Sequence, residues 1–244
     1  MKLTNRISNA ITELFAPTTR CLVCGRDVFD GTAFCSHCAK DVVYNNGKTC
    51  MRCGVGIDGA EDYCENCAFD VMYFDRAYSV FSYEGSVQKA ILSMKFNNLA
   101  VYSKVFAKYL VFMAEKVNLE YDIVTFAPMS KKSLLKRRYN QARELAKHFC
   151  ALQNKDSLLV EAVIKTKDTE AQERLSKTER KTNLIGAYKI NADVKGKRVL
   201  VIDDVKTTGA TLNECAKVLK RAGATAVYGL TVASRKEHFN YEAE

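Results

Sequence analysis

The stretch from Val199 to Thr211, VLVIDDVKTTGAT, constrains the fold more than any other part of the chain. Four apolar residues, Val199 to Ile202, predict a short buried strand, and two adjacent carboxylates, Asp203 and Asp204, follow at its carboxyl end. A loop of small and hydroxyl-bearing residues comes next, and then an amphipathic helix. This order is typical of an open α/β sheet, in which ligands bind just beyond the carboxyl ends of the strands.

The chemistry of this stretch indicates a phosphorylated ribose as the ligand. Carboxylates can hold sugar hydroxyls, and the backbone N–H groups and hydroxyls of the loop can hold a phosphate. A buried strand that ends in a solvated turn is the plainer alternative, because Asp, Thr and Gly are ordinary turn residues. The presence of all the parts in this order favours the phosphoribose interpretation.

The stretch resembles the 5-phosphoribosyl-1-pyrophosphate (PRPP) loop of the type I phosphoribosyltransferases. The resemblance implies that Asp203 and Asp204 hold the ribose 2- and 3-hydroxyls and act as the catalytic residues. It also implies that the loop wraps the 5-phosphate, with a binding set of Thr207, Thr208, Gly209, Ala210 and Thr211. Lys206 stands where that family usually has an apolar residue. The sequence leaves open whether its side chain points to solvent or adds charge near the pocket.

Eight of the ten cysteines fall in four C-x-x-C pairs. These are Cys21, Cys24, Cys35, Cys38, Cys50, Cys53, Cys64 and Cys67. Two such pairs supply the four thiolates of a tetrahedral zinc site, so the spacing predicts two zinc sites. A disulfide framework is disfavoured because the N-terminal residues do not form a secretory signal, and four near-regular pairs are not typical of a redox motif. Zinc would supply the folding energy of this short polar segment.

The spacing of the pairs leaves two ways to share the metals. Sequential sharing gives two ribbon-like sites in tandem, whereas interleaved sharing gives a cross-braced module. We expect the sequential form, because each half then closes locally. His37 lies inside the second pair and is expected at the surface rather than on the metal. Cys150 and Cys215 lie outside the module and are expected as buried core thiols.

The rest of the chain alternates between strand and helix patterns. Strands are expected near residues 76–83, 123–127, 158–165, 187–190, 199–202 and 225–233, and helices near 86–116 (with a break at Asn97-Asn98), 138–152 and 209–222. This alternation predicts an α/β fold with a mainly parallel sheet flanked by helices. We expect two domains. Residues 1–70 would form an N-terminal amphipathic helix and a double zinc-ribbon-like module, and residues 71–244 a phosphoribosyltransferase-like domain.

A run of cations follows the strand expected at 123–127. The segment PMSKKSLLKRRYNQ, Pro128 to Gln141, contains Lys131, Lys132, Lys136, Arg137 and Arg138. A solvated basic helix face is the plain interpretation. However, the segment leaves the carboxyl end of another strand of the same sheet, so it could face the phosphate loop. We expect Lys131 and Lys132 to bind PRPP near its pyrophosphate, where charge develops during transfer. All five cations are candidates for contact with a nucleic-acid backbone.

Taken together, these segments resemble the ComF family, which is linked to DNA uptake in natural competence. The resemblance rests on the four C-x-x-C pairs, PMSKKSLLKRRYNQ, QERLS (172–176), RKTN (180–183) and GAY (186–188). Three features depart from the family pattern. One proline of a P-x-P motif is missing around Pro128, which Met129 follows, Arg138 replaces a glycine, and an arginine often found before Gly186 is absent.

The resemblance implies a type I phosphoribosyltransferase fold that binds PRPP with Mg²⁺ and handles incoming single-stranded DNA during natural transformation. The acceptor of a phosphoribosyl transfer is not apparent. Two alternatives stay open: a weak or inactive PRPP-fold module that binds nucleic acid, and, less expected, a nucleobase salvage enzyme. The family implies a DNA-uptake helicase and recombination-loading proteins as partners, and a cytoplasmic location at the inner face of the membrane.

Net charge and hydropathy are consistent with this interpretation without deciding it. The chain has a formal net charge of +9, which suits a polyanionic partner such as nucleic acid or a phosphorylated substrate. No stretch approaches the roughly 20 apolar residues of a membrane span.

Overall fold

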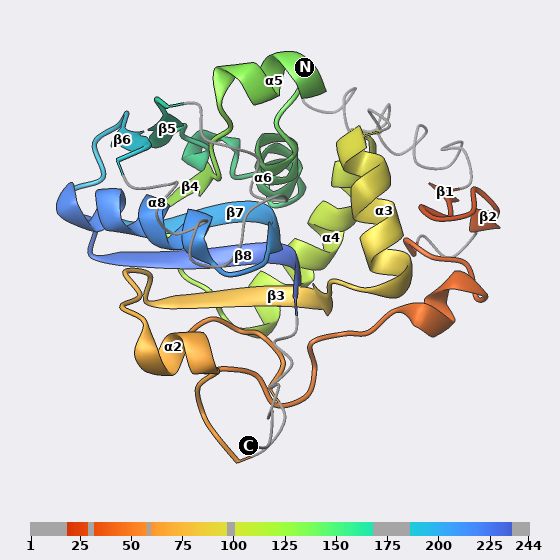
Figure 1. Cartoon of the computed structure of the whole chain (residues 1–244). Helices are drawn as coiled ribbons and strands as arrows, with labels where there is room; N and C mark the ends of the chain where they lie inside the picture. The colour runs from red at the N-terminus through yellow and green to blue at the C-terminus, as the bar shows by residue number, and fades with distance from the viewer. Residues whose placement is uncertain (1–18, 29–31, 58–59, 97–100, 168–185, 236–244) are drawn as a thin grey trace.

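A four-stranded parallel sheet in the order β3-β8-β7-β4 forms the centre of the molecule (Figure 1). Its strands are β3 (Arg76–Ser82), β4 (Ile123–Phe126), β7 (Arg198–Lys206) and β8 (Ala226–Ser234). The computed structural model describes residues 19–28, 32–57, 60–96, 101–167 and 186–235. Parallel sheets are covered on both faces, which explains why β7 begins with a continuous apolar run.

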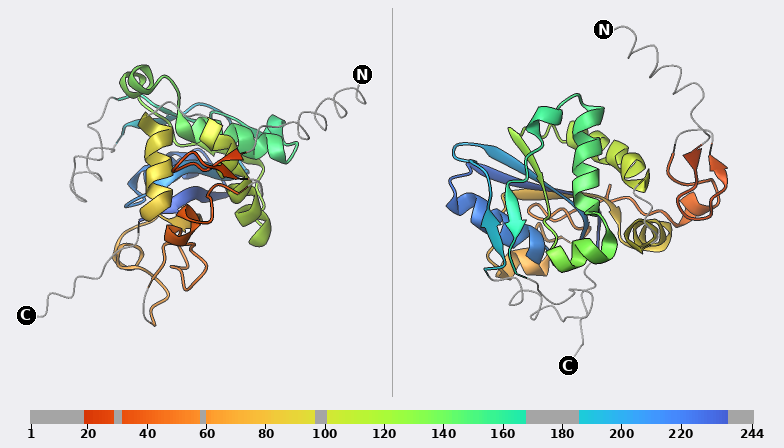
Figure 2. Two further views of the ribbon diagram at one scale, coloured as in Figure 1. Left: turned by 90° about the vertical axis from the view of Figure 1, so that its right-hand side faces the viewer. Right: turned by 90° about the horizontal axis from the view of Figure 1, so that it is seen from above.

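Helices cover the two faces of the sheet and bury alternate residues of β7. The helices α4 (Val101–Lys116) and α6 (Gln141–Leu152) pack with Leu200 and Ile202 in one cluster. The helix α8 (Ala210–Arg221) packs with Val199 and Val201 in another. Figure 2 shows α8 on the opposite side of the sheet from α4 and α6. This alternation follows from the two-residue repeat of a strand.

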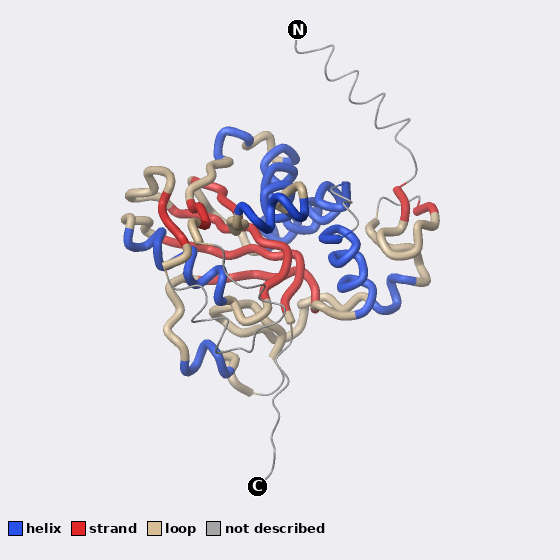
Figure 3. Tube along the Cα trace, turned by 45° about the horizontal axis from the view of Figure 1, so that its top comes forward, coloured by secondary structure: helices blue, strands red, loops and turns tan. Residues whose placement is uncertain are grey.

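Three further parts of the fold surround the carboxyl ends of the strands. The helix α3 (Gly85–Phe96) follows β3, and α5 (Lys131–Arg137) follows β4. An antiparallel pair, β5 (Val163–Lys165) and β6 (Tyr188–Ile190), follows a 3-10 turn, η2 (Asp156–Leu158). Figure 3 shows the four main strands side by side with these elements around them. No helix among the described residues is long and apolar enough to cross a membrane.

The cysteine-rich segment forms two ribbons that contact different parts of the sheet domain. The first ribbon contains β1 (Thr19–Arg20), β2 (Asp27–Val28) and η1 (Cys38–Asp41), and it lies beside α3 (Figure 1). The second ribbon contains α2 (Glu65–Phe69) and lies against the edge strand β3. There the Ala77 N–H donates to the Arg52 carbonyl at 2.8 Å.

The predicted α/β fold with a mainly parallel sheet is confirmed, but three element boundaries differ from the sequence-based expectation. β7 continues to Lys206 because it pairs with β8 as far as Ser234, so the acidic pair lies within the strand rather than after it. The strand expected from Leu158 begins only at Val163.

The third difference concerns the helix expected from Arg138, which begins at Gln141. Arg138 ends α5 in the left-handed conformation, with φ 66°, and Asn140 caps α6. The predicted N-terminal helix and residues 172–183 of the family resemblance lie outside the described residues. The domain boundary at residue 70 stays a prediction.

Candidate functional site

The predicted phosphate loop connects the end of β7 to the first turn of α8. Gly209 precedes α8 with φ 76°, a left-handed conformation that glycine adopts without strain. The Thr208 hydroxyl accepts a long hydrogen bond, 3.4 Å, from the Ala210 N–H. The first N–H groups of a helix lack intrahelical partners, so the start of α8 presents donors suited to an anion.

A cavity of about 480 Å³ lies beyond the carboxyl ends of β4 and β7. The acidic pair and the phosphate loop contribute Asp203, Asp204, Thr207 and Thr211 to its wall. The remaining polar lining residues come from five other segments and are Tyr83, Gln88, Lys95, Ser130, Ser133, Arg137, Asn140, Gln141, Lys165, Tyr188 and Arg235. The predicted acidic pair and phosphate loop therefore line the same cavity as Arg137 of the predicted basic segment. Both carboxylates and positively charged side chains contribute to its wall.

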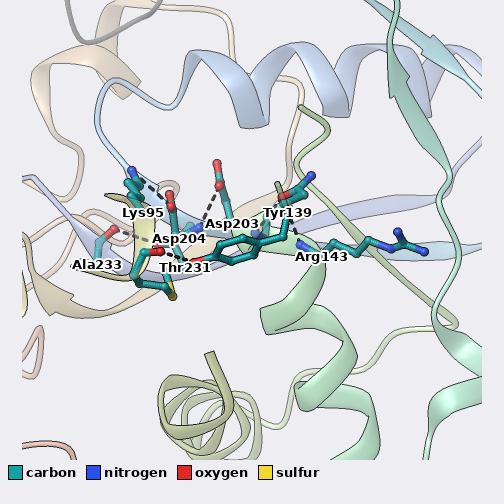
Figure 4. A network of polar contacts seen from close by, with 10 residues as sticks. Lys95, Tyr139, Arg143, Asp203, Asp204, Thr231 and Ala233 are labelled. Carbon is teal, nitrogen blue, oxygen red and sulfur yellow. Dashed lines mark hydrogen bonds and ion pairs between the residues drawn. The ribbon is translucent and has the colours of Figure 1, made fainter. Parts of the chain in front are cut away.

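The last turn of α3 contributes Lys95, a residue that sequence reasoning missed. Its Nζ lies 3.2 Å from Asp204 Oδ2, and both side chains are almost buried (Figure 4). Burial, the largest single effect, would lower the pKa of Lys95, but Asp204, Tyr83 and Asp203 together outweigh it and raise the pKa. No motif marks this lysine, because 109 positions of chain separate it from Asp204 and only the packing of α3 brings them together.

The two carboxyl groups of the acidic pair differ in their surroundings. Asp203 Oδ1 accepts a hydrogen bond from the Asp204 N–H at 2.8 Å, and Asp204 has the ion pair with Lys95. Burial, and then repulsion from Asp204, raise the pKa of Asp203 to about 7. Asp203 is therefore the group at this site that changes charge near neutral pH.

The Tyr139-Asn140-Gln141 motif links the start of α6 by hydrogen bonds to the segment after β4 and to α3. Asn140 Nδ2 donates to the Ala127 carbonyl at 3.0 Å, and its Oδ1 caps α6 by accepting from the Ala142 N–H at 2.9 Å. The Tyr139 hydroxyl donates to the Met94 carbonyl next to Lys95. Gln141 is buried in the cavity wall, and its Nε2 has no hydrogen-bond partner among the described residues. This amide is a donor available to a ligand.

The structure separates the five predicted cations. Arg137 lines the cavity, whereas Lys131, Lys132 and Arg138 do not line it, and both lysines are exposed. The Lys136 side chain lies outside the described part of the structure. The binding of PRPP by Lys131 and Lys132 stays a prediction. Lys165 and Arg235 line the cavity instead, and the sequence analysis did not single them out.

The remaining residues of the predicted loop lie beside the large cavity. Gly209 and Ala210 line a small adjoining cavity of about 20 Å³, together with Thr207 and Thr211. Thr208 lines neither of these two cavities. The loop therefore presents two of its three threonines to the large cavity.

The eight cysteines of the C-x-x-C pairs form two clusters, each with its four sulfur atoms within 4.8 Å of one another. One cluster is Cys21, Cys24, Cys35 and Cys38, and the other is Cys50, Cys53, Cys64 and Cys67. The sulfur atoms of Cys24 and Cys35, and likewise those of Cys53 and Cys64, lie 3.6 Å apart. Zn–S bonds of about 2.3 Å in a tetrahedron place sulfurs about 3.8 Å apart, so the donor sets fit zinc.

These clusters confirm two zinc-binding sites of four cysteines each and the sequential sharing of the pairs. His37 is exposed and belongs to neither cluster, as expected. Cys150 and Cys215 are fully buried, which confirms their prediction as core thiols.

Lys206 occupies a position that neither sequence-based option anticipated. Its side chain is buried, with 6% of the residue exposed, and it does not line the large cavity. Its Nζ lies 3.5 Å from Cys53 Sγ in the second cysteine cluster. The lysine therefore points away from the ligand cavity and toward a zinc-binding site.

Two known domain families match separate parts of the chain. The double zinc ribbon domain matches residues 11–68, and the phosphoribosyl transferase domain matches residues 132–238. The DNA utilization protein YhgH of Escherichia coli K12 is 45% identical over 67 residues, 28% of this chain and 30% of that protein. Competence protein ComFC of Streptococcus pneumoniae is 29% identical over 150 residues, 60% of this chain and 62% of that protein.

This combination of domains, and relatives named for DNA utilization and competence, are consistent with the ComF family. The match spans less than two thirds of the length of these two relatives. Among solved structures, glutamine PRPP amidotransferase from B. subtilis is similar over 53% of this chain and 25% of that one, with 21% identity and a TM-score of 0.36. That score is too low to add to the fold assignment. The phosphoribosyl transferase fold follows from the domain match and the parallel sheet.

Proposed function

We propose that this protein binds PRPP with Mg²⁺ in the 480 Å³ cavity. One observation carries the proposal: Asp203, Asp204 and the phosphate loop line the same cavity as Arg137, Lys165 and Arg235. A sugar with phosphates at both ends needs carboxylates for its hydroxyls and positive groups for its charged ends. The volume lies within the roughly 300–1,000 Å³ typical of small-molecule sites.

Each group has a role that follows from its chemistry. The carboxylates of Asp203 and Asp204 would accept hydrogen bonds from the ribose hydroxyls, and the ion pair with Lys95 would orient Asp204. Thr207, Thr211 and the N–H groups at the start of α8 would hold the 5-phosphate. The carboxylates of Asp203 and Asp204 would hold Mg²⁺, which would offset the negative charge of the bound phosphates. The cations of the cavity wall would stabilise the leaving pyrophosphate if transfer occurs.

Calorimetric titration with PRPP tests this proposal. The wild-type protein should bind PRPP in the presence of Mg²⁺, and the Asp203→Asn/Asp204→Asn double variant should bind at least about tenfold more weakly, since two charge-assisted contacts are lost. Asp193→Asn is a suitable control, because Asp193 does not line the cavity. Equal affinity of the double variant and the wild type would exclude the proposed site.

A second function, binding of single-stranded DNA, is favoured by the surface of α5. Lys131 and Lys132 are exposed there, together with Leu134 and Leu135. Exposed cations beside apolar side chains can contact a nucleic-acid backbone and the faces of its bases. Because Arg137 of the same helix lines the cavity, bound DNA would pass close to the PRPP site.

Titration of a labelled single-stranded oligonucleotide at several salt concentrations tests this second function. Binding should fall steeply with salt, and changing Lys131, Lys132, Arg137 and Arg138 together to Ala should abolish it. Changing Lys195 and Lys197 to Ala, two exposed lysines away from α5, is a control for net charge. Binding that responds neither to salt nor to the α5 changes would rule out this surface.

The role in DNA uptake and natural transformation also belongs to the proposal, and it is supported by the names of the relatives. The same holds for single-stranded DNA, a DNA-uptake helicase and recombination-loading proteins as partners, and for a cytoplasmic location at the inner face of the membrane. If the protein is a transferase, a screen of acceptors with PRPP separates the possibilities. Turnover of a free nucleobase would favour salvage, and PRPP binding without turnover would favour an inactive binding module.

A further inference from the structure

The second zinc site and the phosphate loop meet at one buried side chain, that of Lys206. Its backbone ends β7 immediately before Thr207, the first residue of the loop. Its Nζ lies 3.5 Å from Cys53 Sγ. A single residue therefore belongs to the loop by its backbone and to the zinc-binding cluster by its head group.

The aliphatic part of the Lys206 side chain lies close to Gly209 of the loop. A Cβ placed on Gly209 would lie 3.9 Å from both Cγ and Cδ of Lys206, which is ordinary van der Waals contact. Lys206 and Gly209 line the same small cavity of about 20 Å³. The Lys206 side chain therefore lies next to Gly209, the residue with positive φ that precedes α8.

The charge of Lys206 is balanced by the cysteine cluster. No carboxylate among the described residues forms an ion pair with this lysine. Four thiolates and one Zn²⁺ together have a net charge of −2, and the ammonium group lies against one of those sulfurs. A buried charge that loses its partner is strongly unfavourable, so the lysine and the zinc site depend on each other.

The first zinc site has no such connection to the loop within the described part of the chain. Its buried cysteines contact the α3–α4 side of the molecule, in the hydrophobic cluster that contains Phe81 and Phe106. The second ribbon belongs instead to the cluster of Val201, Ala210 and Leu212, which are residues of β7 and α8 on either side of the loop.

We propose that the second zinc site positions the phosphate loop through Lys206. Lys206 is a positioning residue, because it does not contact the ligand. Its contact with Cys53 makes the backbone position of Thr207–Thr211 depend on whether zinc occupies the Cys50–Cys53–Cys64–Cys67 site. The inference deepens the proposed function and rests on it, since it concerns the loop assigned there to the 5-phosphate. Loss of zinc from this site releases the loop, whereas loss of zinc from the first site does not.

The first test measures zinc retention by chelator competition on the full chain loaded with two zinc ions. In Lys206→Met, which removes the charge and keeps the stem, one zinc should be held about 10–100-fold more weakly, as is usual when a partner of a metal ligand is removed. Lys206→Arg should restore most of the retention. Lys220→Met is the control, because Lys220 pairs with Asp75 on the outside of α8. Unchanged retention of both ions in Lys206→Met overturns the proposal.

The second test measures amide hydrogen exchange of the peptide that covers Thr207–Thr211. Exchange should be faster in Lys206→Met, and also in the wild type after its second-site zinc is removed, but not in Lys220→Met or in Cys24→Ser. The wild-type arm holds even if Lys206→Met fails to fold. Unchanged exchange after removal of the second zinc overturns the proposal.

Different results would contradict the positioning role of Lys206 and the assignment of PRPP as the ligand. If the wild type does not bind PRPP but loop exchange follows second-site zinc, the proposed ligand is wrong and the positioning role stands. If the wild type binds PRPP and Lys206→Met binds it equally well with unchanged loop exchange, the ligand stands and the positioning role is wrong.

Discussion

The two zinc ribbons have the same ligands and the same spacing, but they differ in how deeply their cysteines are buried and in which elements they contact. Each is a C-x-x-C pair, ten residues and a second C-x-x-C pair. In the first, Cys24 is exposed and Cys35 half-buried, whereas all four cysteines of the second are buried. The first rests on helices through a hydrogen bond from the Ala33 N–H to the Tyr109 hydroxyl. The second packs on the strand and helix that flank the candidate phosphate loop.

The comparison shows that identical metal chemistry can serve different purposes within one chain. The first site is exposed at Cys24, although its Cys21 and Cys38 pack into the hydrophobic cluster that contains Phe81 and Phe106. A site inside the shared core replaces the apolar residues that would otherwise fill that space, so its metal becomes part of the stability of the domain. Four kinds of change test the difference between the two ribbons, with effects that range from a large loss of stability to no measurable change.

Removing one zinc ligand from each ribbon should give the largest contrast. Cys50→Ser should lower the free energy of unfolding of the sheet domain by about 5 kcal/mol, because it takes one ligand from a zinc site whose four cysteines are all buried. Cys24→Ser should leave the main unfolding transition within about 1 kcal/mol of the wild type. Calorimetric scanning with a zinc assay measures both. Similar losses from the two variants would contradict the comparison.

The glycines that follow the second cysteine of each ribbon offer a sharper contrast without removing a ligand. Both have positive φ, 73° at Gly25 and 67° at Gly54, so alanine costs about 1 kcal/mol of backbone strain at either. At Gly25 a Cβ meets nothing within 4 Å, but at Gly54 it would lie 2.4 Å from the Ala77 carbonyl oxygen.

We therefore expect Gly54→Ala to lower the free energy of unfolding by about 3 kcal/mol or more, and Gly25→Ala by about 1 kcal/mol. Urea denaturation gives both values. Equal losses would mean that the second ribbon can move away from β3 without cost, and that its close packing is not needed for stability.

The pH dependence of PRPP binding should not respond to the first ribbon. The pKa of Asp203 is raised to about 7 by burial and by Asp204, so the group is largely protonated below that pH. Affinity should then rise with pH through about 7, as the carboxylate becomes able to accept hydrogen bonds. Titration at several pH values should show the same midpoint in Cys24→Ser.

Asp203→Asn serves as the control for this experiment, because PRPP itself also titrates near neutral pH. A rise in affinity with the same midpoint in Asp203→Asn would assign the effect to the ligand. A shifted midpoint in Cys24→Ser would show that the first ribbon also reaches the candidate site.

The smallest effects are expected at the surface ion pair of each ribbon. Arg20 lies 3.9 Å from Asp27 in the first, and Lys48 lies 3.8 Å from Asp62 in the second. Such exposed pairs contribute little, so Arg20→Gln and Asp62→Asn should leave thermal unfolding unchanged within error. A clear loss in either variant would place part of the contrast between the ribbons at their surfaces rather than in their burial.

The sequence by itself determined the features that depend on local spacing. The C-x-x-C pairs predicted both zinc sites, because two cysteines three positions apart meet one metal wherever the segment lies, whereas the structure decided between sequential and interleaved sharing. The apolar run Val199–Ile202 and the loop after it predicted the parallel sheet and the edge at which the candidate site lies, because periodicity and turn chemistry are properties of neighbouring residues.

Only the tertiary structure decided which distant residues meet. Pairing with β8 extends β7 to Lys206, and the packing of α3 places Lys95 on Asp204. The docking of the second ribbon turns Lys206 toward Cys53 rather than toward solvent or the ligand cavity. These outcomes depend on register and on the burial of charge between elements far apart in the chain, and no local pattern encodes either.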